Sequence, residues 1–322
     1  MIGNLDSIDR KIIFELEKNS RIPENALARK LRISREVVRY RMNQLTKMGI
    51  IEGYTTWINI VGMGYQCHKV YLKLFGDQKT RDNFLNLLKE RQDVFWIGVA
   101  DGSWDVGVTF FSKSNSSYYS VRRDLFSTFS ATISDKRMGL VVNAYTYGLK
   151  FLTPSENENI GLFDETTNHD VDSLDRRILK ELFLNSRIRL VDLARKCSSS
   201  MDTIRNRIKN LEKNGIITRY TIRLNHQKLG VEFYKAFLYF DLFDQNVENK
   251  LVEFCNGHPN IVHLVKTITP WEIELEIMVE SHSQYNSVLH ELRNLLPKEL
   301  INIESAILSH DYVFPAKKSI FD

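Results

Sequence analysis

A short basic stretch, SREVVRYRMN starting at Ser34, carries side chains that can recognise nucleic acid. Arginine pairs bidentately with guanine and asparagine with adenine in the major groove, while further cations contact phosphates. Arg41 lies nearer to an apolar stripe, which leaves open an internal ion pair instead. A helix face that is merely solvated is the alternative interpretation. The residues expected to face DNA are Ser34, Arg35, Glu36, Arg39, Tyr40 and Asn43.

A second stretch, SMDTIRNRIKN starting at Ser200, repeats the arrangement with different side chains. Its expected reading face consists of Ser200, Met201, Asp202, Thr203, Arg205, Asn206 and Lys209. Because the two faces differ, we expect two modules that prefer different half-sites on double-stranded DNA. The presence of two such copies favours DNA binding over a solvated face.

Helix signals around both stretches predict how each reading face is held. Asp6 can cap a first helix, Pro23 suits the first turn of a second, and Ser34 can cap a third, which Gly49 ends. The segment 51–61, IIEGYTTWINI, favours a strand pair or wing. The apolar stripes of the third helix are Val38, Met42 and Leu45 in one copy and Ile204, Ile208 and Leu211 in the other. Each copy is therefore predicted to form a winged helix-turn-helix.

The chain is a tandem repeat with an offset of 166 residues. Residues 5–65 align with 171–231 without a gap, and about 27 of the 61 pairs are identical. The downstream parts match more weakly. The seam at 153–170 holds five acidic residues and no Lys or Arg, so it is predicted to be a solvated linker.

Composition and charge narrow the class of protein. The sequence has 322 residues and a formal net charge of +4, but residues 1–66 carry +4 (11 Lys/Arg, 7 Asp/Glu) and 171–231 carry +8 (14 and 6). Such concentration of basic charge is typical of a polyanion-binding module joined to a non-binding one. Apolar runs are too short for a bilayer, and three distant cysteines argue against a disulfide framework. We expect a cytoplasmic protein with no membrane partner.

The segment after each module predicts a βαββαβ order. In the first copy the expected strands are 68–75, 94–100, 104–111 and 136–149, and the expected helices are 80–91 and 116–129. In the second copy the strands lie near 234–241, 261–268, 271–279 and 301–312, and the helices near 246–256 and 283–296. An antiparallel sheet with helices on one side leaves its other face to be covered.

Each half resembles the leucine-responsive regulatory protein/asparagine-regulator (Lrp/AsnC) family. The stretches LDSIDRKIIFELEKNSRI, LARKLRIS and VVRYRMNQLTKMGIIEGYTTWIN and their second copies carry the resemblance. It implies an α+β fold in which two winged helix-turn-helix domains alternate with two ferredoxin-like domains. The expected division is 1–62, 63–152, an acidic linker at 153–170, 171–228 and 229–322.

The resemblance also implies dimers joined through the ferredoxin-like domains and, often, control by a small molecule. One chain with both halves would mimic such a dimer, with homo-oligomers left open. The implied effector loop is Gly102, Ser103, Trp104 and Asp105, and the ordinary alternative is a hairpin turn with a core tryptophan. The second copy has Thr269 in place of the glycine, so it is the less favoured site.

An enzyme related to siroheme decarboxylases, which share this fold, is the competing prediction. The histidines available to it are His68, His226, His258, His263, His282, His290 and His310, without that group's characteristic stretches. DNA packaging without an effector is a third possibility. The sequence predicts no catalytic residue, no cofactor and no metal site, so a DNA-binding regulator is the favoured function.

Overall fold

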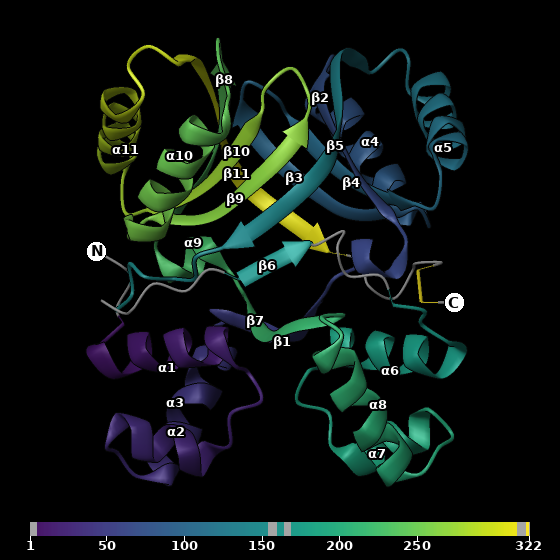
Figure 1. Cartoon of the computed structure of the whole chain (residues 1–322), viewed down its shortest axis with the longest axis vertical. Helices are drawn as coiled ribbons and strands as arrows, with labels where there is room; N and C mark the ends of the chain where they lie inside the picture. Colours follow the sequence, from purple (N-terminus) through teal and green to yellow (C-terminus); the bar gives the residue numbers. More distant parts are fainter. Residues whose placement is uncertain (1–4, 154–159, 164–168, 314–319, 322) are drawn as a thin grey trace.

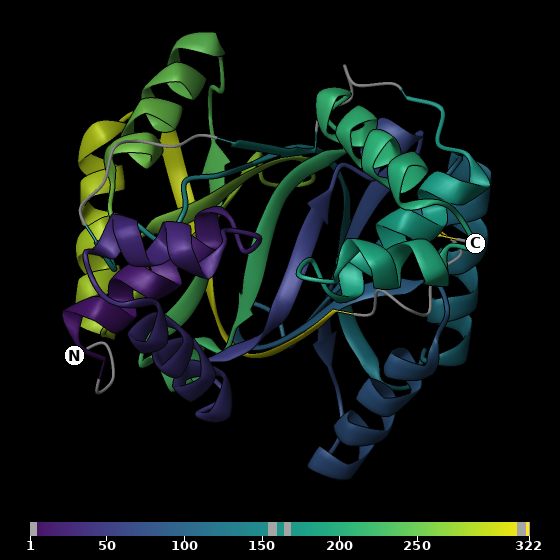
Figure 2. The same cartoon turned by 90° about the horizontal axis from the view of Figure 1, so that it is seen from below.

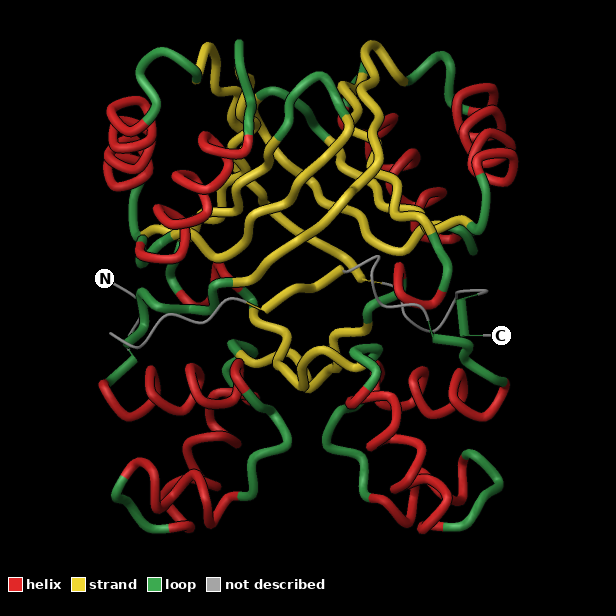
Figure 3. The backbone as a smooth tube through the Cα atoms, in the orientation of Figure 1, coloured by secondary structure: helices red, strands yellow, loops and turns green. Residues whose placement is uncertain are grey.

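The computed structural model describes residues 5–153, 160–163, 169–313 and 320–321. Two small helical lobes lie on the same side of a barrel of strands, and the molecule has an approximate two-fold symmetry (Figures 1 and 3). Among the described residues, no helix combines the length and apolarity that crossing a membrane requires.

Each lobe consists of three short helices. The first lobe holds α1 (Ser7–Lys18), α2 (Glu24–Leu31) and α3 (Arg35–Lys47), and the second holds α6 (Ser173–Leu184), α7 (Leu190–Lys196) and α8 (Met201–Lys213). The expected caps are present, since Asp6 accepts hydrogen bonds from the N–H groups of Ile8 and Asp9 at 2.9 Å. The predicted apolar stripes of α3 and α8 are buried in the lobe cores.

The barrel strands and the helices that cover them form two ferredoxin-like halves, as expected. The first contains β2 (Gln66–Leu74), α4 (Gln78–Glu90), β3 (Val94–Gly102), β4 (Val106–Ser112), α5 (Asn115–Thr128) and β5 (Ile133–Thr146). The second contains β8 (Glu232–Phe240), α10 (Gln245–Gly257), β9 (Ile261–Ile268), β10 (Ile273–Val279), α11 (His282–Leu295) and β11 (Leu300–Val313). Figure 1 shows all four helices on the outside of the strands.

The two halves join by their edges into one closed barrel. The sheet order is β2-β4-β3-β11-β8-β10-β9-β5, and β5 also pairs with β2. Each last strand is 14 residues long, so it can pair with its own half at one end and with the other half at the other end. In β5, for example, residues 133–141 face β2 and residues 140–146 face β9. The uncovered faces of the two sheets thus become the barrel interior.

The predicted wing differs from the structure. Each copy supplies one strand, β1 (Ile51–Ile58) or β7 (Ile217–Leu224), and the two strands pair antiparallel with each other. The prediction of a strand pair inside each module was wrong. A short 3-10 helix, η1 (Val61–Met63), follows β1, so the first module has no second strand of its own at this place. The backbone groups of β1 find their hydrogen-bond partners on β7 instead. The β1–β7 ribbon therefore links the lobes.

The lobe cores are exchanged across this ribbon. Ile58, Ile60 and Met63 of the first copy pack into the apolar cluster of α6, α7 and α8. At the pseudo-two-fold axis, the hydroxyls of Ser20 and Ser186, which are equivalent in the repeat, are 2.6 Å apart. The two lobes are thus packed together through the ribbon and are not independent domains.

The acidic seam also contains an element that the sequence did not predict. Residues Ile160–Phe163 form β6, which pairs with the end of β5. The expectation of a solvated linker therefore does not describe this stretch, because Leu162 and Phe163 pack against an apolar cluster of β2, β5 and β9. The rest of the predicted linker, at 154–159 and 164–168, lies outside the described residues.

Candidate nucleic-acid interface

The third helix of each lobe carries the predicted reading residues. Ser34 caps α3 by accepting the N–H of Val37 at 3.2 Å, and Ser200 caps α8 by accepting the N–H of Thr203 at 3.1 Å. Both helices lie in the lobes below the barrel, on either side of the ribbon (Figures 1 and 2). Helix N-termini that carry such side chains are suited to base edges and phosphates.

All of the predicted reading residues are exposed. In α3 these are Ser34, Arg35, Glu36, Arg39, Tyr40 and Asn43, and in α8 they are Ser200, Met201, Asp202, Thr203, Arg205, Asn206 and Lys209. Tyr40 and Met201 are large apolar side chains that are 60% and 48% exposed. Neither face is covered by another described part of the chain, so both remain available to a partner.

The reading face of α3 is held by a residue that the sequence analysis missed. One carboxylate oxygen of Glu24, on α2, lies 3.1 Å from Nε of Arg35 and 2.8 Å from Nη2 of Arg39. These hydrogen bonds, chiefly the one from Arg39, lower the pKa of Glu24. The carboxylate orients both guanidinium groups, but it also competes with any phosphate that they could bind.

The second lobe has no such carboxylate. The position equivalent to Glu24 is Leu190, and Arg205 pairs with Asp202 on its own helix. Asp202 is 85% exposed, so this ion pair contributes little and restrains Arg205 only weakly. The sequence contains a sign of this difference, because Glu24 in the first copy aligns with Leu190 in the second. The two faces therefore differ in how their arginines are restrained as well as in sequence.

Arg41 makes the internal ion pair that the sequence analysis left open. Its guanidinium lies 2.8 Å from Asp6 and 3.2 Å from Asp9, so α3 is fastened to α1. The equivalent Arg207 lies 2.7 Å from Asp172 and 3.1 Å from Asp175. These two arginines position the third helices, and they are not among the predicted reading residues.

The predicted effector loop lies at the junction of the two halves. Gly102 has φ +128°, and a Cβ there would come within 2.4 Å of the carbonyl oxygen of Ser305 on β11. Ser103 donates its N–H to that same carbonyl, and Trp104 is buried beside Trp271 in the barrel core. Asp105 binds Lys73 at 3.0 Å. Packing thus accounts for the glycine, and effector binding by this loop stays a prediction.

Most of the histidines have local structural partners. Nε2 of His68 hydrogen-bonds to the hydroxyl of Ser112, and burial lowers its pKa to about 4. His258 lies 3.6 Å from Glu291. No group of three or more potential metal ligands occurs in the part of the chain that the structure describes.

Comparisons with known proteins agree with this architecture. Residues 5–52 and 171–218 match a family described as winged helix-turn-helix DNA-binding. An uncharacterized HTH-type transcriptional regulator of Pyrococcus furiosus is 30% identical over 125 residues, which cover 38% of this chain and 80% of that protein. A second one from the same organism is 44% identical over 63 residues, and the match spans 20% of this chain and 43% of that relative.

Two further proteins are similar to this chain, one in its fold over the whole chain and one in its sequence over about a third of it. The siroheme decarboxylase NirDL, in complex with an iron-uroporphyrin III analogue, superposes with a TM-score of 0.65 over 98% of this chain and 96% of its own. Its sequence identity is 11%, so this likeness shows the fold alone. The HTH-type transcriptional regulator LrpB of Bacillus subtilis is 30% identical over 122 residues, 38% of this chain and 80% of LrpB. The chain therefore belongs to the Lrp/AsnC family of HTH-type transcriptional regulators, and it carries the family's unit twice.

Proposed function

We propose that the chain is a sequence-specific transcription regulator that binds a two-part, non-palindromic DNA site. The observation that carries the proposal is the pairing of β1 with β7, which holds two different reading helices on one side of a single polypeptide. A dimeric regulator presents two identical helices to half-sites about one DNA turn, or a multiple of it, apart. Here the two helices differ, so the half-sites should differ as well.

The charge of the lobes supports this proposal. Net positive charge is concentrated in the segments that form the lobes and the ribbon, and both reading faces are exposed. Binding should weaken as salt rises, because Lys and Arg displace counterions from phosphates. Small-molecule control, with Gly102, Ser103, Trp104 and Asp105 as the first site to test, and assembly into homo-oligomers are further parts of the proposal.

The test is a DNA-binding selection on the purified chain and on Arg39→Ala and Arg205→Ala. Enrichment of an asymmetric two-part site is expected, and each substitution should relax base preference in a different half. Arg123→Ala, an exposed arginine on α5, is the matched control and should leave the selected site unchanged. A palindromic site, or no enrichment with all variants alike, would refute the proposal.

A tetrapyrrole enzyme is the second candidate, because the fold likeness to NirDL extends over almost the whole chain. It predicts that the chain binds an iron porphyrin tightly and changes it chemically. Titration with iron uroporphyrin, followed by visible absorbance, separates the two candidates. An unshifted spectrum excludes the enzyme, while a saturating shift at equimolar protein, followed by loss of carboxylate groups, would favour it over the regulator.

A further inference from the structure

The two copies carry opposite charges at one pair of equivalent positions. Arg137 on β5 is paired in register with Tyr71 on β2, and Glu304 on β11 is paired with Phe237 on β8. Because Tyr71 and Phe237 are equivalent in the repeat, Arg137 and Glu304 are equivalent too. Nη1 of Arg137 lies 2.6 Å from the Glu304 carboxylate, so these positions meet at the approximate two-fold axis. A pair of identical copies would place two arginines or two glutamates there.

A second ion pair between the copies has no counterpart across the axis. Glu17 on α1 lies 2.6 Å from Arg219 on β7, and their side chains are 7% and 2% exposed. The repeat equivalents of Glu17 and Arg219 are Phe183 and Gly53, so the symmetry-related positions carry no charge. A pair of first copies would bury Glu17 without Arg219, and a pair of second copies would bury Arg219 without Glu17. Removing one partner of a buried ion pair is strongly destabilising.

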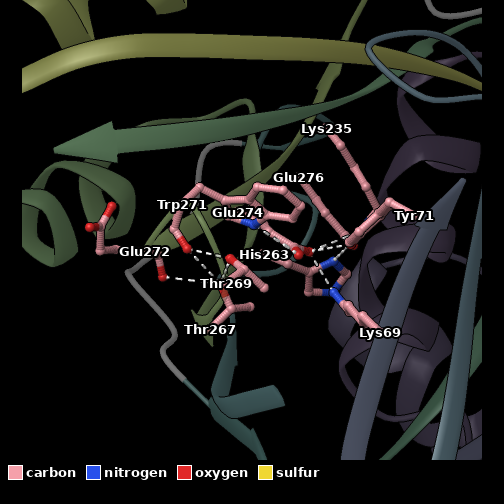
Figure 4. Close-up of polar contacts among 10 residues, drawn as sticks. All are labelled: Lys69, Tyr71, Lys235, His263, Thr267, Thr269, Trp271, Glu272, Glu274 and Glu276. Atoms are coloured by element: carbon pink, nitrogen blue, oxygen red, sulfur yellow. Dashed lines mark hydrogen bonds and ion pairs between the residues drawn. The ribbon is translucent and has the colours of Figure 1, made fainter. Parts of the chain in front are cut away.

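A third contact between the copies lies inside the barrel, where Figure 4 shows the side chains converging. Nζ of Lys69 on β2 is 2.6 Å from Glu274 on β10, and Nζ of the equivalent Lys235 on β8 is 3.7 Å from the same carboxylate oxygen. Burial raises the pKa of Glu274, but the two lysines lower it more, so this pKa lies below its usual value. The repeat equivalent of Glu274 is Gly107. A pair of first copies would therefore bring two lysines together and lose the carboxylate between them.

These three contacts are all satisfied only when a first copy meets a second copy. We infer that they make the copies selective for each other, so that the barrel and ribbon interface of each copy accepts the other kind and rejects its own. The accepted partner is a face of complementary charge, supplied by the same chain or by a second one. Ion pairs of this kind discriminate between partners even where they add little stability, because like charges placed opposite each other cost free energy.

The duplication is what makes this selectivity useful. Two chains could exchange their halves, giving one barrel from two first copies and another from two second copies. Such molecules would carry two α3 helices or two α8 helices, whereas the selectivity keeps one of each in every barrel. This consequence rests on the proposed function, because only a pair of different reading helices would select a non-palindromic site. The pairing itself involves no DNA.

The first test reverses the charges at positions 137 and 304 of the full chain, where the side chains are 35% and 25% exposed and have room to be replaced. Arg137→Glu sets two carboxylates at the axis, as a pair of second copies would, and Glu304→Arg sets two guanidinium groups there. Each should lower the melting temperature by about 2–4 °C, and the two together should restore it. A double variant that melts no higher than the single variants would overturn the inference.

The second test lets the charges choose a partner from another chain. The Arg137→Glu and Glu304→Arg chains, one of them isotopically labelled, are unfolded in urea, mixed and refolded together. The mixture holds about 0.1 mM chain, so that exchange of halves can compete with pairing inside one chain. After exchange, one barrel has the natural ion pair and the other has the reversed pair. Native mass spectrometry should therefore show a two-chain species that contains one chain of each kind.

The matched control is an ion pair within one copy. Lys266 on β9 binds Glu248 on α10, both residues belong to the second copy, and their side chains are 21% and 23% exposed. Exchange of halves between Lys266→Glu and Glu248→Lys chains cannot restore this pair, so the mixed two-chain species should be rarer by about fivefold or more. Equal abundance in the two mixtures, or absence from both, would overturn the inference.

The outcomes are independent of DNA binding. A chain that shows the expected pairing but selects no DNA would refute only the regulator proposal. A chain that selects an asymmetric two-part site but pairs without regard to these charges would refute only the inference of selectivity.

Discussion

Neutralising Glu24 should strengthen the first reading face and steepen the salt dependence of DNA binding. The structure gives Glu24 two arginine partners, at 3.1 Å for Arg35 and 2.8 Å for Arg39, and both arginine side chains remain about half exposed. In Glu24→Gln the carboxylate charge is lost while the side-chain shape is kept. Both guanidinium groups are then free to bind phosphate, and a negative charge that repels the DNA is gone.

The magnitude follows from the number of charges. Each neutralised phosphate changes the slope of log K against log salt by about 0.9 on duplex DNA, so removing one opposing charge should steepen the slope by about 1. Between 50 and 200 mM salt, a fourfold change, this amounts to a roughly threefold to fourfold difference. The variant should therefore bind more tightly than wild type at 50 mM, with an advantage that shrinks by about that factor at 200 mM.

The assay is fluorescence anisotropy on the selected site over this salt range. Asp124→Asn is the matched control, because it makes the same change in net charge at an α5 carboxylate that pairs with Arg91, far from the reading helices in sequence and in the fold. It should reproduce wild-type affinity and slope. Equal slopes for Glu24→Gln and wild type would show that Glu24 does not compete with DNA. Weaker binding by Glu24→Gln would show that Glu24 positions the arginines for DNA. Either result would refute the reasoning.

Two further predictions concern stability. His68 is buried with its pKa lowered to about 4, so below about pH 6.5 the unfolded chain binds the additional proton and folding loses stability as pH falls. Between pH 6 and 4.5, wild type should lose about 1 kcal/mol of unfolding free energy per pH unit relative to His68→Phe, as measured by urea titration; parallel pH profiles would contradict the assigned protonation. Arg219 and Glu17 form a buried pair at 2.6 Å, so Arg219→Met should cost about 3–5 kcal/mol by the same method. Glu17→Leu combined with Arg219→Met should recover most of it, since the repeat equivalents of Glu17 and Arg219 are the uncharged Phe183 and Gly53; no recovery would mean that the loss does not arise from an unpaired charge.

The sequence predicted well those features that depend on neighbours along the chain. The caps at Asp6 and Ser34 and the stripe of Val38, Met42 and Leu45 act within one or two turns, so they place α1 and α3 without tertiary information. The exposure of the predicted reading residues follows from the same periodicity. The βαββαβ order follows from alternating apolar patterns, with boundaries that shifted by a few residues.

The features that the sequence missed depend on long-range partners. β1 and β7 pair across 166 residues, so neither strand alone indicates whether it belongs to a hairpin or to a ribbon between copies. Glu24 meets Arg39 only because α2 and α3 pack together. The acidic seam was predicted to be solvated because of its five acidic residues. In the structure, Leu162 and Phe163 of this seam pack against an apolar cluster on β2, β5 and β9.

By itself, the sequence determined the duplication, the two helix-turn-helix modules, the different residues exposed on their third helices and the family, because these follow from local periodicity and from the self-match. Only the tertiary structure decided that the sheets close into one barrel, that the lobes exchange strands and that Lys69 meets Glu274, which lies 205 residues away. The physical reason is that strand pairing and buried ion pairs form between surfaces brought together by folding. One-dimensional patterns specify which face of an element is apolar but not which surface will cover it.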